Sequence, residues 1–359
     1  MSKQRFTSET PSTRKILPQI VTIEAEIAEG LESIAENELR RTLEGVMSGL
    51  RRSKTGLRFE FTGKLGLLRR LGTVQAVYSV QQYAIPRPKA LLGDENWRRF
   101  RAQIDDAIAH HNPDTFMTFT IAAAGSDSSV MSRIKQEISA STGLIESEKG
   151  DLWIRIIPGE TGWETLVRLT PRPLVTRAWR ICNYEAALNA TVAHAMILLS
   201  VPKSEDVVVN LGCGSGTLMI ERLLVERASL VIGIDNDPLA LECAMQNTAA
   251  RGLAYQAALV HANMTSAPLP SAFADTIFAD LPFGQKVGSH RENQTLYPRV
   301  LHEAARIAKI GASFVLITHE IRLIESALAE HPFWKTENIL KVTLRGLHPR
   351  LYVLRRMQD

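Results

Sequence analysis

The spacing of apolar positions changes several times along the 359-residue chain, and each change suggests a boundary between structural units. Residues 1–18 are rich in Ser, Thr, Lys and Arg, and a segment with so little to bury predicts a flexible tail. From residue 19 to 87 the pattern predicts a small β-α-β unit, which the prolines Pro86 and Pro88 end. Its predicted elements are strands at 20–30 and 56–63, helices at 30–45 and 64–77, and an apolar run at 77–85.

A second set of patterns covers residues 88–170 and predicts another small α+β domain. One of its helices begins after Ser and Asp residues suited to N-capping, and Gly143 follows where that helix should end. A connector and a helix fill residues 171–201. The predicted helices lie at 96–111, 126–141 and 185–199, and the predicted strands lie at 115–125, 151–159 and 163–170.

From Asp206 onward, strand-like apolar runs alternate regularly with helical patterns. Strands separated by helices of this length predict a mostly parallel, doubly wound sheet with helices on both faces. Only a short turn separates the runs at 338–346 and 350–356, so they predict a hairpin that adds antiparallel strands to the sheet edge. We therefore expect one α/β domain at residues 202–359.

Charge and cysteine content narrow the classes of protein that remain. Lys and Arg (42) slightly outnumber Asp and Glu (38), so the charge permits an acidic polymer as partner without requiring one. Cys182, Cys213 and Cys243 lie far apart with no metal-ligand spacing, which argues against a disulfide framework and a structural zinc. The N-terminus has no apolar secretion segment, and no later stretch reaches about 18 apolar residues. We expect a soluble, cytoplasmic monomer without a metal.

A glycine-rich turn follows the first strand of the C-terminal domain. Gly212, Gly214 and Gly216 stand between the strand at 207–211 and the next helix. Glycine allows a tight turn and a close ligand approach, and the start of a helix offers unpaired N–H groups. The pattern predicts a cofactor-binding loop, with a plain strand-to-helix turn as the alternative.

Polar residues end the next two strands. Asp235 ends the second strand, 19 residues after Gly216, where a carboxylate can accept hydrogen bonds from a ribose diol. Capping of the following helix is the alternative for Asp235 and the preferred interpretation for Asp237. Asn263 ends the third strand, and it either contacts the cofactor's base or satisfies its own loop backbone.

The segment DLPF, Asp280–Phe283, ends the fourth strand and carries the groups needed to hold an amino-bearing base. Asp280 can accept a hydrogen bond from an exocyclic amine, and the carbonyl of Leu281, which precedes Pro282, can accept a second. Phe283 offers a flat surface for stacking, worth ~1–3 kcal/mol per base. Two acceptors on one amine aim the nitrogen lone pair at an electrophile, and the proton leaves to Asp280 or to solvent. A strand-ending Asp with a proline turn is the alternative, but its coincidence with the glycine turn favours a site.

These motifs resemble those of a known family. NLGCGSGT, GIDNDP and DLPFG resemble the amino-methyltransferases of the (Asp/Asn)-Pro-Pro-(Tyr/Phe) type, and DLPFGQKVGSH is similar to the THUMP-containing tRNA guanine-N2 methyltransferases. GLESIAENEL resembles the ferredoxin-like segment of that family. The resemblance implies a ferredoxin-like domain at 19–87, a THUMP-like RNA-binding domain at 88–170, and a class I, Rossmann-like methyltransferase domain at 202–359.

The family resemblance also implies an activity and a set of roles. The expected protein is an S-adenosylmethionine-dependent methyltransferase that forms N2-methylguanosine in tRNA, with its N-terminal domains measuring the distance from a tRNA end to the catalytic pocket. Asn210 stands where the family often has Asp, and Asn263 also replaces an acid, so two carboxylate contacts to the cofactor become amides. The implied roles are the methionine end for Gly212, Gly214 and Gly216, ribose for Asp235, adenine for Asn263, and the guanine for Asp280, Leu281, Pro282 and Phe283.

Basic residues near the predicted site suggest how RNA is held. Arg172, Arg177 and Arg180 lie in the connector with Trp179 between them, a mixture suited to phosphate binding and stacking. Lys286 and Arg291 follow DLPFG closely, so they are candidates to clamp the entering substrate.

Other functions would share either the proposed chemistry or the predicted sheet. The same chemistry would serve an amino group in ribosomal RNA or an adenine in DNA, and the amides at Asn210 and Asn263 suggest an RNA-binding module that has lost catalysis. A nicotinamide oxidoreductase fits the sheet but leaves DLPFG unexplained. A thiouridine synthetase requires an SGGxDS loop and a reactive cysteine pair, and the sequence has neither.

Overall fold

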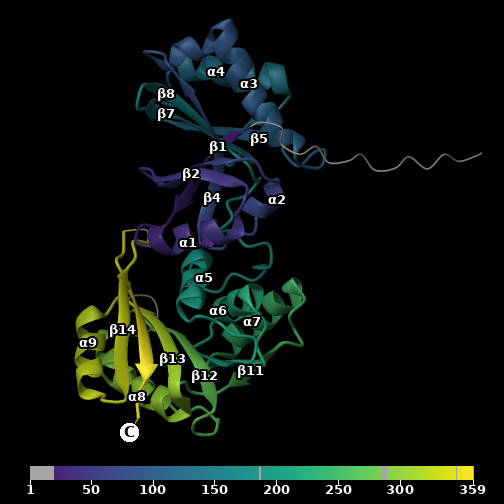
Figure 1. Cartoon of the computed structure of the whole chain (residues 1–359). Coiled ribbons are helices and arrows are strands. Elements are labelled where there is room, and N and C mark those ends of the chain that lie inside the picture. Colours follow the sequence, from purple (N-terminus) through teal and green to yellow (C-terminus); the bar gives the residue numbers. More distant parts are fainter. Residues whose placement is uncertain (1–19, 186, 284–288, 345, 359) are drawn as a thin grey trace, which may run out of the picture.

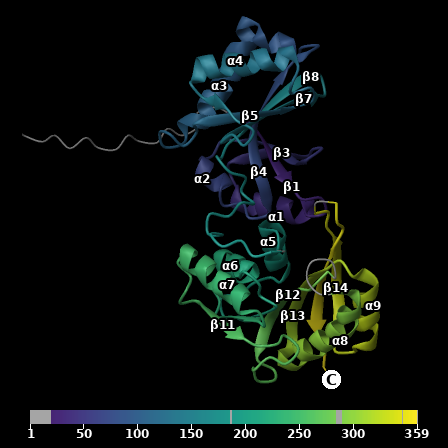
Figure 2. The ribbon, with the colours of Figure 1, turned by 180° about the vertical axis from the view of Figure 1, so that it is seen from behind.

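The chain folds into two units stacked end to end, each built around its own sheet (Figure 1). The computed structural model describes residues 20–185, 187–283, 289–344 and 346–358, so the predicted tail lies outside the described residues. Helix α5 (Ala190–Leu199) lies at the junction of the two units, and it contacts a helix of each (Figure 2). None of the described helices is long and apolar enough to span a bilayer.

The N-terminal unit is one eight-stranded sheet in the order β2-β3-β1-β4-β8-β7-β5-β6. Strands from residues 19–87 and from residues 88–170 therefore share a sheet. The ten-residue strand β4 (Val74–Tyr83) joins them, since it pairs with β1 on one side and with β8 on the other. The other elements are β1 (Val21–Ile27), α1 (Glu32–Thr42), β2 (Met47–Arg52), β3 (Gly56–Phe61), α2 (Leu65–Leu68), a 3-10 helix (Pro88–Leu92), α3 (Asp94–Ala109), β5 (Thr118–Ala123), α4 (Ser129–Thr142), β6 (Ile145–Glu146), β7 (Leu152–Gly159) and β8 (Gly162–Arg168).

Most of the elements predicted for this unit are confirmed, but the helix predicted at 64–77 is wrong. Only Leu65–Leu68 is helical, and β4 begins at Val74. The buried leucines Leu65, Leu68 and Leu71 have helical spacing, yet they bury one short turn against the sheet. The predicted caps of α4 are confirmed: the Ser128 hydroxyl accepts from the Met131 N–H, and Gly143 ends the helix with a φ of +79°.

A buried ion-pair network crosses the middle of the N-terminal sheet. Arg58 on β3 donates from Nε to Glu24 (2.7 Å) and from Nη1 and Nη2 to Glu164 (2.8 and 3.0 Å). Gln82 also donates to Glu164 (3.0 Å). The hydrogen bonds that Arg58 donates to Glu164 and Glu24 raise the pKa of Arg58. Burial opposes ionisation of Glu164, but the bond from Arg58 lowers the pKa of Glu164. Strands β3, β1 and β8 are thereby tied together by charge.

The C-terminal unit is the predicted doubly wound α/β domain. Its strand order is β11-β10-β9-β12-β13-β15-β14; the first five strands are parallel, and the hairpin β14–β15 adds antiparallel strands at one edge, as predicted. The order reverses between β9 and β12, and in open α/β sheets the ligand-binding crevice is expected outside the carboxyl ends of the strands at such a point. The elements are β9 (Val207–Leu211), α6 (Thr217–Val225), β10 (Leu230–Asp235), α7 (Pro238–Arg251), β11 (Ala257–His261), β12 (Ala274–Asp280), α8 (His290–Ile307), β13 (Ala308–Thr318), α9 (Ile321–Glu330), β14 (Trp334–Lys341) and β15 (Arg350–Arg356).

A disulfide joins Cys182 in the connector to Cys243 on α7, 61 residues later, so the expectation of a chain without disulfides is wrong. The two cysteines meet because the connector folds back along α7, where Asn247 accepts from the Cys182 N–H (2.9 Å) and donates to its carbonyl (3.1 Å). Sequence spacing carries no sign of this proximity. Cys213, the third cysteine, is a buried free thiol.

Candidate active site

The candidate site lies where the carboxyl ends of β9 and β12 meet. Leu211 pairs with Ala279 across these parallel strands, so the next residues, Gly212 and Asp280, begin two neighbouring loops. This is the point at which the strand order reverses, the usual place for a ligand in an open α/β sheet. The glycine turn and the DLPF segment, far apart in sequence, therefore begin at the same edge of the sheet, where the crevice is expected.

The glycine turn has a backbone that side chains would disturb. Gly212, Gly214 and Gly216 have φ angles of +66°, +51° and +81°, in the left-handed region that favours glycine. A Cβ on Gly216 would lie 3.2 Å from the Cβ of Ala244, whereas a Cβ on Gly214 would meet nothing within 4 Å. The turn is thus packed at its end and open at its centre, directly before the N-terminus of α6.

Asp235 supports the glycine turn from the next strand. Its carboxylate accepts from the Gly214 N–H (2.8 Å) and from the Asp237 N–H (3.0 Å), while its side chain stays partly exposed. Asp237 accepts from the Leu239 N–H (2.9 Å) and caps α7, which confirms that interpretation. A hydrogen bond from the Tyr184 hydroxyl lowers the pKa of Asp237. The connector therefore reaches the same edge of the sheet.

The two amides occupy different environments. Asn263 is exposed, and its Oδ1 accepts from the N–H and hydroxyl of Thr265 (both 2.9 Å). Of the two interpretations of Asn263, the contact with its own loop is therefore present. Asn210 is buried beneath the glycine turn and donates to the Phe278 carbonyl (3.2 Å). Its Oδ1 has no hydrogen-bond partner within the described residues. A buried acceptor of this kind points to a donor supplied by a ligand.

The DLPF segment is held by helix α8 and strand β13. The Leu281 N–H donates to Ile317 (3.0 Å), which continues the pairing of β12 with β13. The Pro282 carbonyl accepts from Asn293 (2.9 Å) and from the Tyr297 hydroxyl (2.7 Å). These bonds fix the main chain on both sides of the Leu281 carbonyl.

The acid and the ring of this segment differ in their surroundings. Burial raises the pKa of Asp280 to about 7, although part of its side chain reaches the surface. Phe283 is partly exposed, and its ring lies 6.1 Å from the His319 ring, centroid to centroid, at a tilt of 36°. Neither residue is locked in the core. An acid that titrates near neutrality beside an accessible ring suits the binding of a flat, amino-bearing molecule.

Asn293 and Tyr297 were not predicted as part of the site. Both are buried on α8, and the Tyr297 hydroxyl also bonds to the Thr318 hydroxyl (2.6 Å). Their spacing of four residues, on one helix face just after DLPFG, is the signal that could have identified them. They position the loop rather than line the crevice.

The connector arginines are largely occupied within the protein. Arg177 pairs with Glu221 (2.8 Å) and donates to the Gly72 carbonyl (2.7 Å), and Arg180 donates to Leu188 and Thr217 (both 2.9 Å). These bonds do not leave either guanidinium directed freely at a phosphate.

The remaining residues predicted to contact RNA are placed differently. Trp179 is only 5% exposed and packs on Ile220, so its predicted stacking on a base is wrong. Arg172 and Arg291 are exposed, and Lys286 lies outside the described residues. Within the described part of the chain, no three His, Cys, Asp or Glu side chains gather as a metal site would require.

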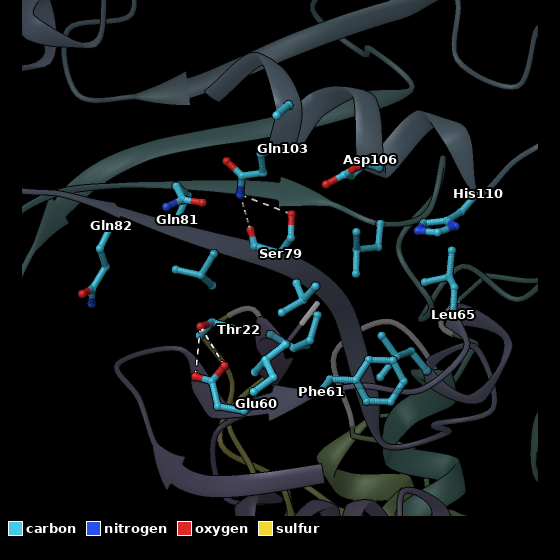
Figure 3. A pocket seen from close by; sticks show the side chains of 18 of the residues that line it. Thr22, Glu60, Phe61, Leu65, Ser79, Gln81, Gln82, Gln103, Asp106 and His110 are labelled. Carbon is cyan, nitrogen blue, oxygen red and sulfur yellow. Dashed lines mark hydrogen bonds between the residues drawn. The ribbon is translucent and has the colours of Figure 1, made fainter. Parts of the chain in front are cut away.

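A cavity of about 580 Å³ lies elsewhere, in the N-terminal unit (Figure 3). Gln103 and Asp106 line it from α3, with His110 directly after this helix, and Gln103 donates to the Ser79 carbonyl (2.9 Å). All its lining residues precede residue 170, so this cavity is separate from the crevice at the glycine turn.

Comparison with known proteins places these features in a family context. Residues 177–350 match the family described as RMKL-like, methyltransferase domain. The mouse tRNA (guanine(6)-N(2))-methyltransferase THUMP3 is 32% identical over 184 residues, 47% of this chain and 36% of the mouse protein. The bovine U6 snRNA (guanine-N(2))-methyltransferase THUMPD2 is 32% identical over 148 residues, 41% of this chain and 28% of the bovine protein. The chain thus spans about a third of the length of these relatives.

One solved structure is similar over nearly the whole chain. TrmN from Thermus thermophilus superposes with a TM-score of 0.72 at 22% identity, covering 94% of this chain and all of that one. At this identity the similarity shows the fold alone, and it extends across both sheets.

Proposed function

We propose that this chain is an S-adenosylmethionine-dependent RNA methyltransferase that forms N2-methylguanosine in tRNA, on the premise that residues 177–350 match the RMKL-like methyltransferase domain. The observation that carries the proposal is the placement of DLPF one strand away from the glycine turn, at the same sheet edge. The names of the relatives support the reaction, because each acts on guanine N2 of an RNA.

The crevice fits the proposed cofactor. Bound S-adenosylmethionine would supply an electrophilic methyl group on a sulfonium. Gly212, Gly214 and Gly216 would border its methionine end, where the open centre of the turn admits backbone contact. The unpartnered Oδ1 of Asn210 would accept from the amino group, so the amide retains an acceptor that the family's usual acid provides. Asp235 and Asn263, at the next two strand ends, would meet the ribose and the adenine.

The DLPF segment would hold the guanine. Asp280 and the Leu281 carbonyl would accept the two hydrogens of the exocyclic N2, which aims the nitrogen lone pair away from both acceptors. Phe283 would stack on the base. Asn293 and Tyr297 keep the Pro282 carbonyl turned toward α8, so the Leu281 carbonyl does not have to reorganise when the base arrives. After transfer, the proton would pass to Asp280 or to solvent.

The N-terminal unit would present the RNA. We propose that residues 19–87 are ferredoxin-like, that residues 88–170 form a THUMP-like RNA-binding domain, and that the protein is cytoplasmic. Exposed Arg172 in the connector and exposed Arg291 on α8, with Lys286, are the proposed phosphate contacts. Support comes from the whole-chain similarity to TrmN and from the exposed positions of these two arginines.

Asp235→Ala is expected to weaken S-adenosylmethionine binding by about 10- to 100-fold, since it removes ribose contacts and the bond that holds the Gly214 N–H. Isothermal calorimetry measures this change. The matched control is Asp275→Asn, at the opposite end of the same sheet, which should bind the cofactor as the unchanged protein does. Equal affinities for Asp235→Ala and the control would remove Asp235 from the cofactor site.

The reaction itself is tested with unmodified tRNA and a labelled methyl donor. Nuclease digestion and mass spectrometry should find the label in N2-methylguanosine. Ribosomal RNA, U6 snRNA and adenine-containing DNA serve as parallel substrates, and preferential labelling of any of them would overturn the tRNA assignment. Failure to bind S-adenosylmethionine at millimolar concentration would instead favour the inactive RNA-binding module.

A further inference from the structure

A buried histidine lies at the junction of the two units, away from the candidate active site. His194 on α5 directs Nε2 at the Glu38 carboxylate of α1, 3.2 Å away, and Nδ1 at the Glu221 carboxylate of α6, 2.8 Å away. Glu38 belongs to the N-terminal unit, and Glu221 belongs to the methyltransferase domain. A ring with a carboxylate at each nitrogen donates from both, so it is held as an imidazolium.

Each carboxylate is fixed by further donors. Glu38 accepts from the N–H groups of Gly72 (2.7 Å) and Thr73 (2.9 Å). Glu221 accepts from Nε of Arg177 (2.8 Å), whose Nη2 crosses to the Gly72 carbonyl (2.7 Å). The Thr73 hydroxyl also donates to Glu38. The side chains of Glu38 and Glu221 are 4% and 1% exposed, so donors of the protein rather than solvent compensate their charges.

The cluster is balanced in charge, with two carboxylates facing one imidazolium and one guanidinium. Burial alone would lower the pKa of His194, but the hydrogen bonds that the ring donates to Glu221 and Glu38 raise it to about 9. Burial opposes ionisation of both acids, yet the bond to His194 lowers the pKa of each. His194 and the two acids therefore carry their charges at neutral pH.

The backbone of the N-terminal unit packs closely against the His194 ring. A Cβ on Gly72 would lie 2.2 Å from the ring atoms of His194, so the N-terminal unit approaches with bare backbone. A second contact lies away from the cluster, where Thr343, after β14, donates to the Glu29 carbonyl (2.9 Å). The two units are therefore held together at two separate places.

We propose that His194, Glu38 and Glu221 form an interdomain clamp, and that His194 is a positioning residue that sets which nucleotide of a bound RNA reaches Asp280. The clamp fixes the angle between the unit that would hold the RNA and the domain that would modify it. The selection of a nucleotide rests on the proposed function, whereas the fixed angle does not. Arg177, predicted to bind phosphate, has its role here.

The fixed angle is tested by small-angle X-ray scattering on the full chain. His194→Gln leaves two carboxylates without their shared cation, so we expect its distance distribution to broaden, with the unchanged protein and a Glu36→Gln control remaining narrow. Glu36 is the matched control because it lies on the same helix and pairs with exposed Arg40. If the distance distribution of His194→Gln coincides with those of the unchanged protein and of Glu36→Gln, the proposed clamp is wrong.

The same measurement has a pH dependence of known sign. Because the folded pKa of His194 lies above the unfolded value of about 6.5, the clamp is fully present below pH 6.5 and is lost as pH rises through about 9. The unchanged protein should broaden between pH 7 and 9.5, and His194→Gln should show no such change. The acids do not titrate in this window, because their pKa values are lowered.

Nucleotide selection is tested by mapping methyl groups on tRNA. His194→Gln should lose about 10- to 100-fold in kcat/KM at the preferred guanosine, with label appearing at neighbouring guanosines and cofactor affinity unchanged. The double variant Glu38→Gln/His194→Gln removes one unpaired acid, so it should regain thermal stability without regaining selectivity. Recovery of both would show that the histidine only stabilises the fold. Absence of tRNA methylation by the unchanged protein would count against the proposed function. The scattering experiment would still test the clamp, because it does not depend on methyl transfer.

Discussion

Replacing Asp280 by Asn is expected to lower kcat for methyl transfer by about 100-fold or more while cofactor affinity stays within about twofold. Asn keeps one acceptor oxygen, but it adds an N–H₂ group that faces the amine, and it cannot take a proton. Single-turnover assays with labelled cofactor measure the first effect, and calorimetry measures the second. Asp275→Asn, at the start of the same strand, is the matched control because its carboxylate pairs with Lys309 far from the crevice. Retention of more than half the activity would exclude Asp280 from the chemistry.

The role of Asp280 should also appear in the pH dependence of activity and of stability. Since burial raises the pKa of Asp280 to about 7, kcat/KM should rise with pH through about 7 as the acceptor carboxylate forms. The ionised form is also the costly one for the fold. Asp280→Asn should therefore stabilise the protein above pH 7, by on the order of 1–3 kcal/mol, and have little effect at pH 5. Urea unfolding at the two pH values checks this difference.

Arg58→Ala is expected to have the largest effect on stability, a loss of about 3–5 kcal/mol in the free energy of unfolding of the N-terminal unit. The substitution leaves Glu24 and Glu164 buried without their shared cation in the middle of the sheet. Hydrogen exchange of β1 and β8 under native conditions measures the loss. Arg40→Ala, which breaks an exposed pair on α1, should cost about 1 kcal/mol or less. A loss no greater than that of this control would show that the network contributes little.

The sequence predicted the C-terminal domain in most of its detail because its pattern is local. Strands β9, β10 and β12 are mostly apolar runs with a glycine or polar residue at or directly after their ends, and helices α6 and α7 follow β9 and β10 within a few residues. The positions of the glycine turn and of Asp280 at one edge follow from the parallel order alone. Helix α9 (Ile321–Glu330) and strand β2 (Met47–Arg52) escaped prediction, and β2 lies on a sheet edge where its burial does not alternate.

The features that sequence reasoning missed depend on residues far apart in the chain. Arg177 and Trp179 suggested an RNA surface by composition, but Glu221, 44 residues later, neutralises the first, and Ile220 covers the second. Cys182 meets Cys243 only after the connector has folded along α7. Similarly, the sequence around His194 does not predict that Glu38 and Glu221 face its ring. Partners of this kind become visible only when tertiary structure brings them together.

The ten-residue strand β4 makes the N-terminal unit indivisible. A chain cut after Tyr83 would leave the β8-facing edge of β4 bare, with its row of N–H and C=O groups open to any extended segment nearby. The excised remainder would carry the complementary bare edge on β8. Isolated halves should therefore self-associate or recombine with each other, and a hinge within this unit would first have to unzip a ladder of main-chain bonds. Whatever bending the molecule undergoes is thus confined to the seam beside α5.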